Sequence, residues 1–85
     1  MEDDSYTKNK KILFGILVRT VRLRAKISQE ELADRSGLDR TYIGGVERGE
    51  RNPSLLSIHK IAEGLNVTVS ELFAELPSSE KGVCD

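Results

Sequence analysis

The stretch from Ser28 to Gly49 constrains this chain more than any other part of its sequence. Ser28 is a preferred N-cap residue, and Glu31 follows three residues later, as in an S-x-x-E capping box. Gly37 can adopt the left-handed backbone conformation that commonly ends a helix. Asp39 is placed to cap a second helix, which Gly49 would end. The spacing therefore predicts two short helices joined by a tight turn.

Small and branched side chains would let these two helices cross closely. Ala33 leaves room on the first helix, Gly37 makes the corner, and Ile43 fills the angle between the two axes. This combination is typical of a helix-turn-helix. A plain helical bundle without a ligand is the alternative, and the agreement between caps, turn glycine and flanking helices disfavours it.

The remaining apolar pattern predicts three more helices. One runs over 8–26, a fourth starts after Ser54, and a short fifth is capped by Thr68 or Ser70. Their buried sides are expected to be Leu13, Phe14, Leu17, Val18 and Val21; Leu55, Ile58, Ile61, Ala62 and Leu65; and Val69, Leu72, Phe73 and Leu76. We therefore predict an all-α fold, a compact five-helix bundle in a single domain spanning 1–85. Its ordered core is expected over about 8–76, with flexible tails at 1–7 and 77–85.

Charge is distributed unevenly along the chain. The net charge of −1 lacks the basic excess of many nucleic-acid-binding proteins and counts mildly against that class. Acidic residues gather at both ends, however, and arginines gather in the middle. This distribution predicts one basic face on an otherwise acidic body.

Several classes of protein are disfavoured by what the sequence contains. The single cysteine, Cys84, allows no internal disulfide, and the single histidine, His59, has no histidine partner for a metal site. We expect no metal and no cofactor. The sequence shows no nucleophile motif or phosphate loop, so an enzyme is the least favoured class. No apolar run approaches the length of a membrane span and no signal peptide is evident, so we expect a cytoplasmic protein.

Several short segments resemble the Cro/C1-type (Xre-family) helix-turn-helix domain, the lambda-repressor-like fold of phage repressors. They are Gln29, Leu32 with Ala33, Gly37 with Leu38, Arg40 to Ile43, Glu47 to Gly49, and Asn52 with Pro53. The segment from Leu38 to Asn52 also resembles controller proteins of restriction–modification systems. The resemblance implies a homodimer that binds operator DNA and regulates transcription, with RNA polymerase as a further candidate partner and no membrane involved.

Within such a motif, physical arguments assign roles to residues, and the resemblance adds the role of Gln29. The second helix of the motif would enter the major groove with its N-terminal end first. Arg40 is the best candidate for reading a base, because a guanidinium can bond O6 and N7 of guanine together; a phosphate contact is the alternative. Arg51 could instead be solvated surface charge. The predicted DNA-binding residues are Gln29, Arg40, Thr41, Tyr42, Gly45, Arg48, Arg51 and Asn52.

Two further features follow from the comparison with this family. Arg22 and Glu47 match positions that form a largely buried salt bridge between the first helix and the recognition helix. Gly44 and Gly45 depart from the common pattern, which often has a long polar side chain where Gly45 stands. Gly45 could let the helix sit deeper in the groove, or leave specificity to Arg40 and to DNA deformability.

The apolar residues near the C-terminal end exceed what a small core obviously needs. We therefore predict that some of these residues form a dimer contact, with Val67, Val69, Leu72, Phe73 and Leu76 as the candidates. Two other functions stay open. One is a DNA-binding antitoxin or accessory subunit whose tail binds another protein. The other is a protein-interaction module that kept the fold and lost its affinity for DNA.

Overall fold

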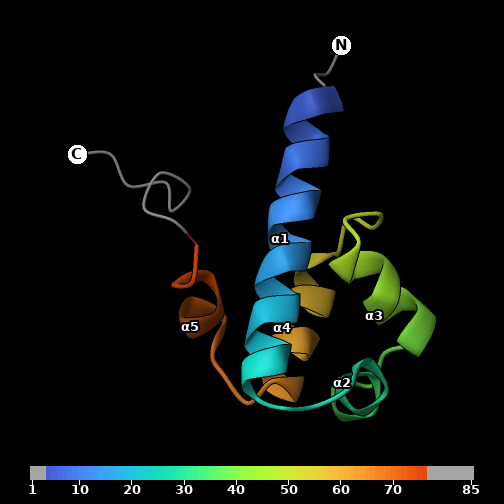
Figure 1. Cartoon of the computed structure of the whole chain (residues 1–85), viewed down its shortest axis with the longest axis vertical. Coiled ribbons are helices and arrows are strands. Elements are labelled where there is room, and N and C mark those ends of the chain that lie inside the picture. Colours follow the sequence, from blue (N-terminus) through green and yellow to red (C-terminus); the bar gives the residue numbers. More distant parts are fainter. Residues whose placement is uncertain (1–3, 77–85) are drawn as a thin grey trace.

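A computed structural model describes residues 4–76 of the chain, and in this range it contains five α-helices (Figure 1). They are α1 (Asp4–Arg24), α2 (Gln29–Ser36), α3 (Arg40–Glu47), α4 (Leu55–Gly64) and α5 (Val69–Phe73). The all-α, five-helix prediction is confirmed. The predicted tail over 77–85, with Cys84, lies outside the described residues, as do residues 1–3. No helix within the described range is long and apolar enough to span a bilayer.

Helix α1 begins earlier than the predicted helix over 8–26. It starts at Asp4, whose carboxylate lies in the first turn, near the positive end of the helix dipole. One turn further, the Nζ of Lys10 lies 5.2 Å from the ring centroid of Tyr6, a cation–π pair at i,i+4 spacing. Residues 4–7, predicted as tail, are therefore helical. At its other end α1 stops at Arg24, and Lys26 adopts a left-handed φ of 63°.

The predicted N-caps form hydrogen bonds to the backbone of the first turn. Side chains cap the helices after them at Ser28, Asp39 and Ser54. The box at Ser28 is only half formed, because the Glu31 carboxylate pairs with Arg35 at 2.6 Å instead of returning to the cap. The complete capping box is at α5, where Thr68 and Glu71 exchange bonds of 2.9 and 3.0 Å. Thr68 is thus the α5 cap, rather than Ser70.

The core is formed by all five helices around α1, with α3 and α5 on opposite sides of it (Figure 1). Its most deeply buried side chains are Leu32, Ile43, Ile61, Leu72, Val18 and Val46. Leu55 was predicted to be buried, but it is 72% exposed. It is the first residue of α4 and precedes by one turn Ile58, the first residue of that helix that packs on the core.

Helix α5 is needed to close this core. Leu72 is fully buried within its own chain, so of the predicted set it has no exposed surface to offer to a dimer contact. The other four residues of that predicted set are half-buried and pack against the same core: Val67, Val69, Phe73 and Leu76. The ring of Phe73 stacks on Phe14 of α1, with centroids 5.7 Å apart. Much of the apolar surface that suggested a second copy is therefore covered by α1.

Two glycines inside helices allow close helix packing. A Cβ atom on Gly15 of α1 would lie 2.6 Å from the carbonyl oxygen of Glu47, so α1 touches the backbone at the end of α3. A Cβ atom on Gly64 of α4 would lie 2.9 Å from a methyl group of Leu32 on α2. These contacts fix the position of α2 and α3 relative to the rest of the domain.

Candidate nucleic-acid interface

Helices α2 and α3 form the predicted helix-turn-helix. Gly37 has a φ of 72°, and the chain turns there while the N–H of Leu38 donates to the carbonyl of Ala33 at 3.0 Å. Ala33 is 4% exposed and Ile43 is fully buried between the helices. The small residue, the corner glycine and the branched residue therefore occupy the predicted places.

The N-terminal end of α3 projects from the domain. Ile43 and Val46 hold the inner side of this helix in the core, whereas Arg40 and Thr41 are exposed at its start. Within residues 4–76, the Arg40 side chain makes no hydrogen bond or ion pair. A free guanidinium at the exposed tip of a helix is available to a base edge or to a phosphate.

A buried ion pair holds the other end of α3. The Nε and Nη2 atoms of Arg22 donate to the two carboxylate oxygens of Glu47 at 2.6 and 3.0 Å, and the side chains are 8% and 2% exposed. The remaining Nη1 of Arg22 donates to the carbonyl of Ile27 at 2.9 Å. The salt bridge implied by the family resemblance is therefore present, and each guanidinium nitrogen of Arg22 donates a hydrogen bond.

Gln29 joins this buried network. Its Nε2 donates to Oε1 of Glu47 at 3.0 Å, which ties the first turn of α2 to the last turn of α3. Its predicted contact with a DNA phosphate stays a prediction. In the free protein its amide positions α3.

The two loop arginines after α3 are held in different ways. Arg48 forms a two-point ion pair with Glu50, at 3.0 and 3.1 Å, and both side chains are exposed. The hydrogen bond from Arg48 lowers the pKa of the Glu50 carboxyl below its usual range. The guanidinium carbon of Arg51 lies 5.5 Å from the ring centroid of Tyr42. Thr41, Gly44, Gly45 and Arg48 share one side of α3 by helical spacing, so these arginines lie beside the predicted reading surface.

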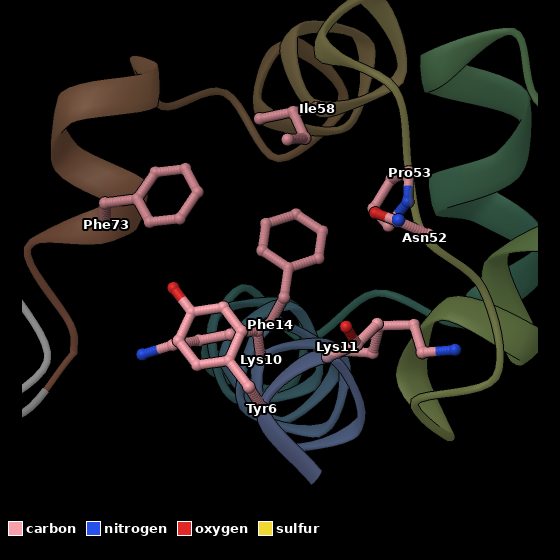
Figure 2. A pocket seen from close by; sticks show the side chains of 9 residues that line it. Tyr6, Lys10, Lys11, Phe14, Asn52, Pro53, Ile58 and Phe73 are labelled. Carbon is pink, nitrogen blue, oxygen red and sulfur yellow. The ribbon is translucent and has the colours of Figure 1, made fainter. Parts of the chain in front are cut away.

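Asn52 lies next to a different feature, a hollow of about 340 Å³ between α1, the α3–α4 loop, α4 and α5 (Figure 2). Phe14, Phe73 and Ile58 give this hollow an apolar floor, and Lys10 and Lys11 stand at its edge. The structure thus brings seven of the eight predicted DNA-binding residues to α3 and its immediate surroundings. Asn52, the eighth, lines the hollow instead.

Two features of this surface, the ion pair of Glu50 and the burial of Gly45, were not predicted from the sequence. Glu50 was treated only as part of a connector, although its spacing of two from Arg48 was a visible signal for an ion pair. Gly45 is buried, because the side chain of Arg51 covers it. That burial had no signal in the sequence, since it depends on the path of the loop after α3.

An exposed recognition helix, anchored at its rear and flanked by arginines, defines a helix-turn-helix DNA-binding protein. The helix-turn-helix family model matches residues 18–72. Control protein C.MunI of Mycoplasma sp is 43% identical over 67 residues, which cover 78% of this chain and 90% of that protein. The chain therefore belongs to the Cro/C1-type helix-turn-helix family, among the restriction–modification control proteins.

Solved structures agree with this assignment. The restriction–modification controller protein C.AhdI from Aeromonas hydrophila is 48% identical, with a TM-score of 0.73 over 75% of this chain and 97% of that chain. Controller protein C.Esp1396I, solved as a tetramer with its natural 35 base-pair operator, is 38% identical. Its TM-score is 0.73, over 75% of this chain and 84% of that chain. The resemblance stated from the sequence is confirmed.

Proposed function

We propose that this protein is a transcriptional regulator that binds an operator as a homodimer and acts as a restriction–modification controller protein. The observation that carries the proposal is the geometry of α3. Its Arg40 and Thr41 project from the domain, while the buried Arg22–Glu47 pair holds its far end. A rigid helix presented in this way fits the major groove, which admits one α-helix.

In this proposal each half of the dimer reads one half-site. Arg40 bonds a guanine through O6 and N7, and Thr41 meets a neighbouring base edge. Arg48, Arg51 and Gln29 contact phosphates and set the register. Two-fold symmetry then places the half-sites about 34 Å apart, one turn of the double helix.

We assign the dimer contact to the start of α4 together with the exposed part of α5. Leu55 and Leu56 are 72% and 64% exposed, which are high values for leucines in a small domain. Leu55 lies one turn before Ile58, and half-buried Phe73 borders the same hollow as Ile58. A second copy on this face would lie next to the loop that follows α3. The oligomer of C.Esp1396I on its operator supports a second copy as the occupant.

The experiment that tests the proposal is selection of bound DNA from a random pool, followed by titration of the selected duplex. Arg40→Ala is expected to relax the preference at one base pair per half-site by about 1–3 kcal/mol. Lys60→Ala, which removes a positive charge on α4 outside the motif, serves as the charge-matched control. Uniform weakening on all sequences would assign Arg40 to a phosphate instead.

Salt dependence separates this function from the alternative of a protein-interaction module. Phosphate contacts release counterions, so the affinity for duplex DNA should fall steeply as salt rises. Absence of any salt-dependent duplex binding would favour the module. Because a regulator must reach its operator, we expect the protein in the cytoplasm. Contact with RNA polymerase, which an activator needs, stays a prediction.

A further inference from the structure

The side chain of Arg51 lies across α3 at the position of Gly45. A Cβ atom on Gly45 would lie 3.0 Å from Cγ and 3.1 Å from Nε of Arg51. One turn earlier on the same helix, the ring of Tyr42 lies under the guanidinium, with 5.5 Å between its centroid and the guanidinium carbon. Arg51 belongs to the loop after α3, so this loop folds back over the recognition helix.

The backbone does not explain why a glycine stands at this position. Within residues 4–76, positive φ values among glycines occur at Gly37 and Gly49, and Gly45 has ordinary helical geometry. Alanine forms helices better than glycine does, so the fold alone would favour a side chain here. The space over Gly45 is filled by Arg51, and that packing is the feature that a side chain would disturb.

We infer that Gly45 and Tyr42 form a slot that holds Arg51 against the outer side of α3, and that Gly45 is therefore a positioning residue for DNA recognition. The inference rests on the proposed function. In place of a side chain of its own at this point, the recognition helix uses a guanidinium supplied by the following loop. The Tyr42 ring gives this cation a flat surface on which to lie.

The slot has a consequence that a purely structural glycine would not have. Gly45→Ala should raise the melting temperature by a few degrees, because α3 gains helix propensity. The same change should weaken operator binding several-fold, because the Arg51 side chain has to shift away from its position over Gly45 to make room for the methyl group. Gly45→Gln fills the slot completely and should weaken binding about tenfold, close to the loss caused by Arg51→Ala. Stability and affinity thus move in opposite directions for the alanine variant.

A double-mutant cycle tests the inference. Affinity for the selected duplex is measured for Gly45→Gln, Arg51→Ala and the double variant at several salt concentrations. If the glycine acts through Arg51, the double variant binds no worse than Arg51→Ala alone, and each single change lowers the salt slope similarly. Gly44→Ala is the matched control, because its Cβ would meet Arg48 and Gln29 and not Arg51. Its effect should add to that of Arg51→Ala.

Three results would overturn the inference. One is an equal loss from Gly45→Gln with and without Arg51, which would mean that the DNA itself needs the space. Another is an unchanged affinity for the duplex in Arg51→Ala while Arg40→Ala still weakens binding. That result would leave the proposed function intact. A third is unchanged affinity for DNA in Tyr42→Leu, which would exclude a slot. This variant tests the other side of the slot and remains available if Gly45→Gln fails to fold. If the unmodified protein binds no duplex DNA at all, the proposed function is rejected instead.

Discussion

Glu50 is the one exposed acidic residue placed between the two loop arginines, and its charge opposes the function proposed for them. It occupies Arg48 through both carboxylate oxygens, so Arg48 must leave this pair, or share it, to reach a phosphate. Arg48 also lowers the pKa of the Glu50 carboxyl, so the group stays ionised at neutral pH. The residue therefore restrains DNA binding, and in particular the binding that depends on phosphates alone.

Replacing Glu50 by Gln should strengthen duplex binding by about three- to tenfold at low salt, an effect that shrinks as salt screens the charges. Stability should change little, because both side chains of the pair are more than half exposed to solvent. The pKa of the Glu50 carboxyl is lowered, so the ion pair is fully present above the usual titration range of a glutamate. It is lost only as pH falls through the lowered pKa. The two proteins should therefore differ in affinity at all pH values down to that point.

Anisotropy titrations at two salt concentrations measure the effect of Glu50→Gln, with Glu63→Gln on α4 as control. Weaker binding by Glu50→Gln would contradict this role.

At the scale of the helices, the rear anchor of α3 determines whether its tip is held in place. Glu47→Ala leaves Arg22 buried without its partner and Gln29 without its acceptor, which typically costs about 3–5 kcal/mol. We expect a fall in melting temperature of roughly 10 °C or more for a domain of this size. DNA binding should be lost with it, although Glu47 faces inward. Thermal unfolding followed by circular dichroism measures this, and Glu31→Ala, which breaks the exposed pair with Arg35, should shift the transition only slightly. Equal melting temperatures for Glu47→Ala and the parent would reject this account.

The helices also show which parts of the fold the sequence could predict. N-caps such as Ser28 and Asp39 bond within their own first turn, so local spacing was enough to find them. The Arg22–Glu47 bridge joins distant parts of the chain and was found only through the resemblance to a family. The close packing at Gly15 and the fold-back of Arg51 depend on how segments cross in space. The hydrophobic periodicity of a sequence does not show how segments pack against one another. The exposure of Leu55 was missed because it also depends on this packing.

At the scale of the whole molecule, the question is where a second copy binds. A chain of only 85 residues can gain stability from association, and an operator with two half-sites requires two recognition helices. With Leu72 inside the core and α5 packed on α1, the first turn of α4 offers the most exposed leucines among the described residues. This surface lies directly after the loop that follows α3, and the exposed tip of α3, with Arg40 and Thr41, is not part of it.

The last prediction follows from this placement. Changing Leu55 and Leu56 together to Ser should convert the dimer to a monomer and weaken operator binding at least tenfold, since each half-site would then be bound without its neighbour. The fold should persist, because both side chains are exposed in the single chain. Sedimentation velocity at tens of micromolar measures the first effect and circular dichroism the second. Leu23→Ser, on α1 and 52% exposed, is the matched control and should remain dimeric.

If the double variant still sediments as a dimer, the contact lies elsewhere, and the half-buried residues of α5 become the next surface to test. A parent protein that is monomeric at these concentrations would instead require that the two copies meet only on the DNA.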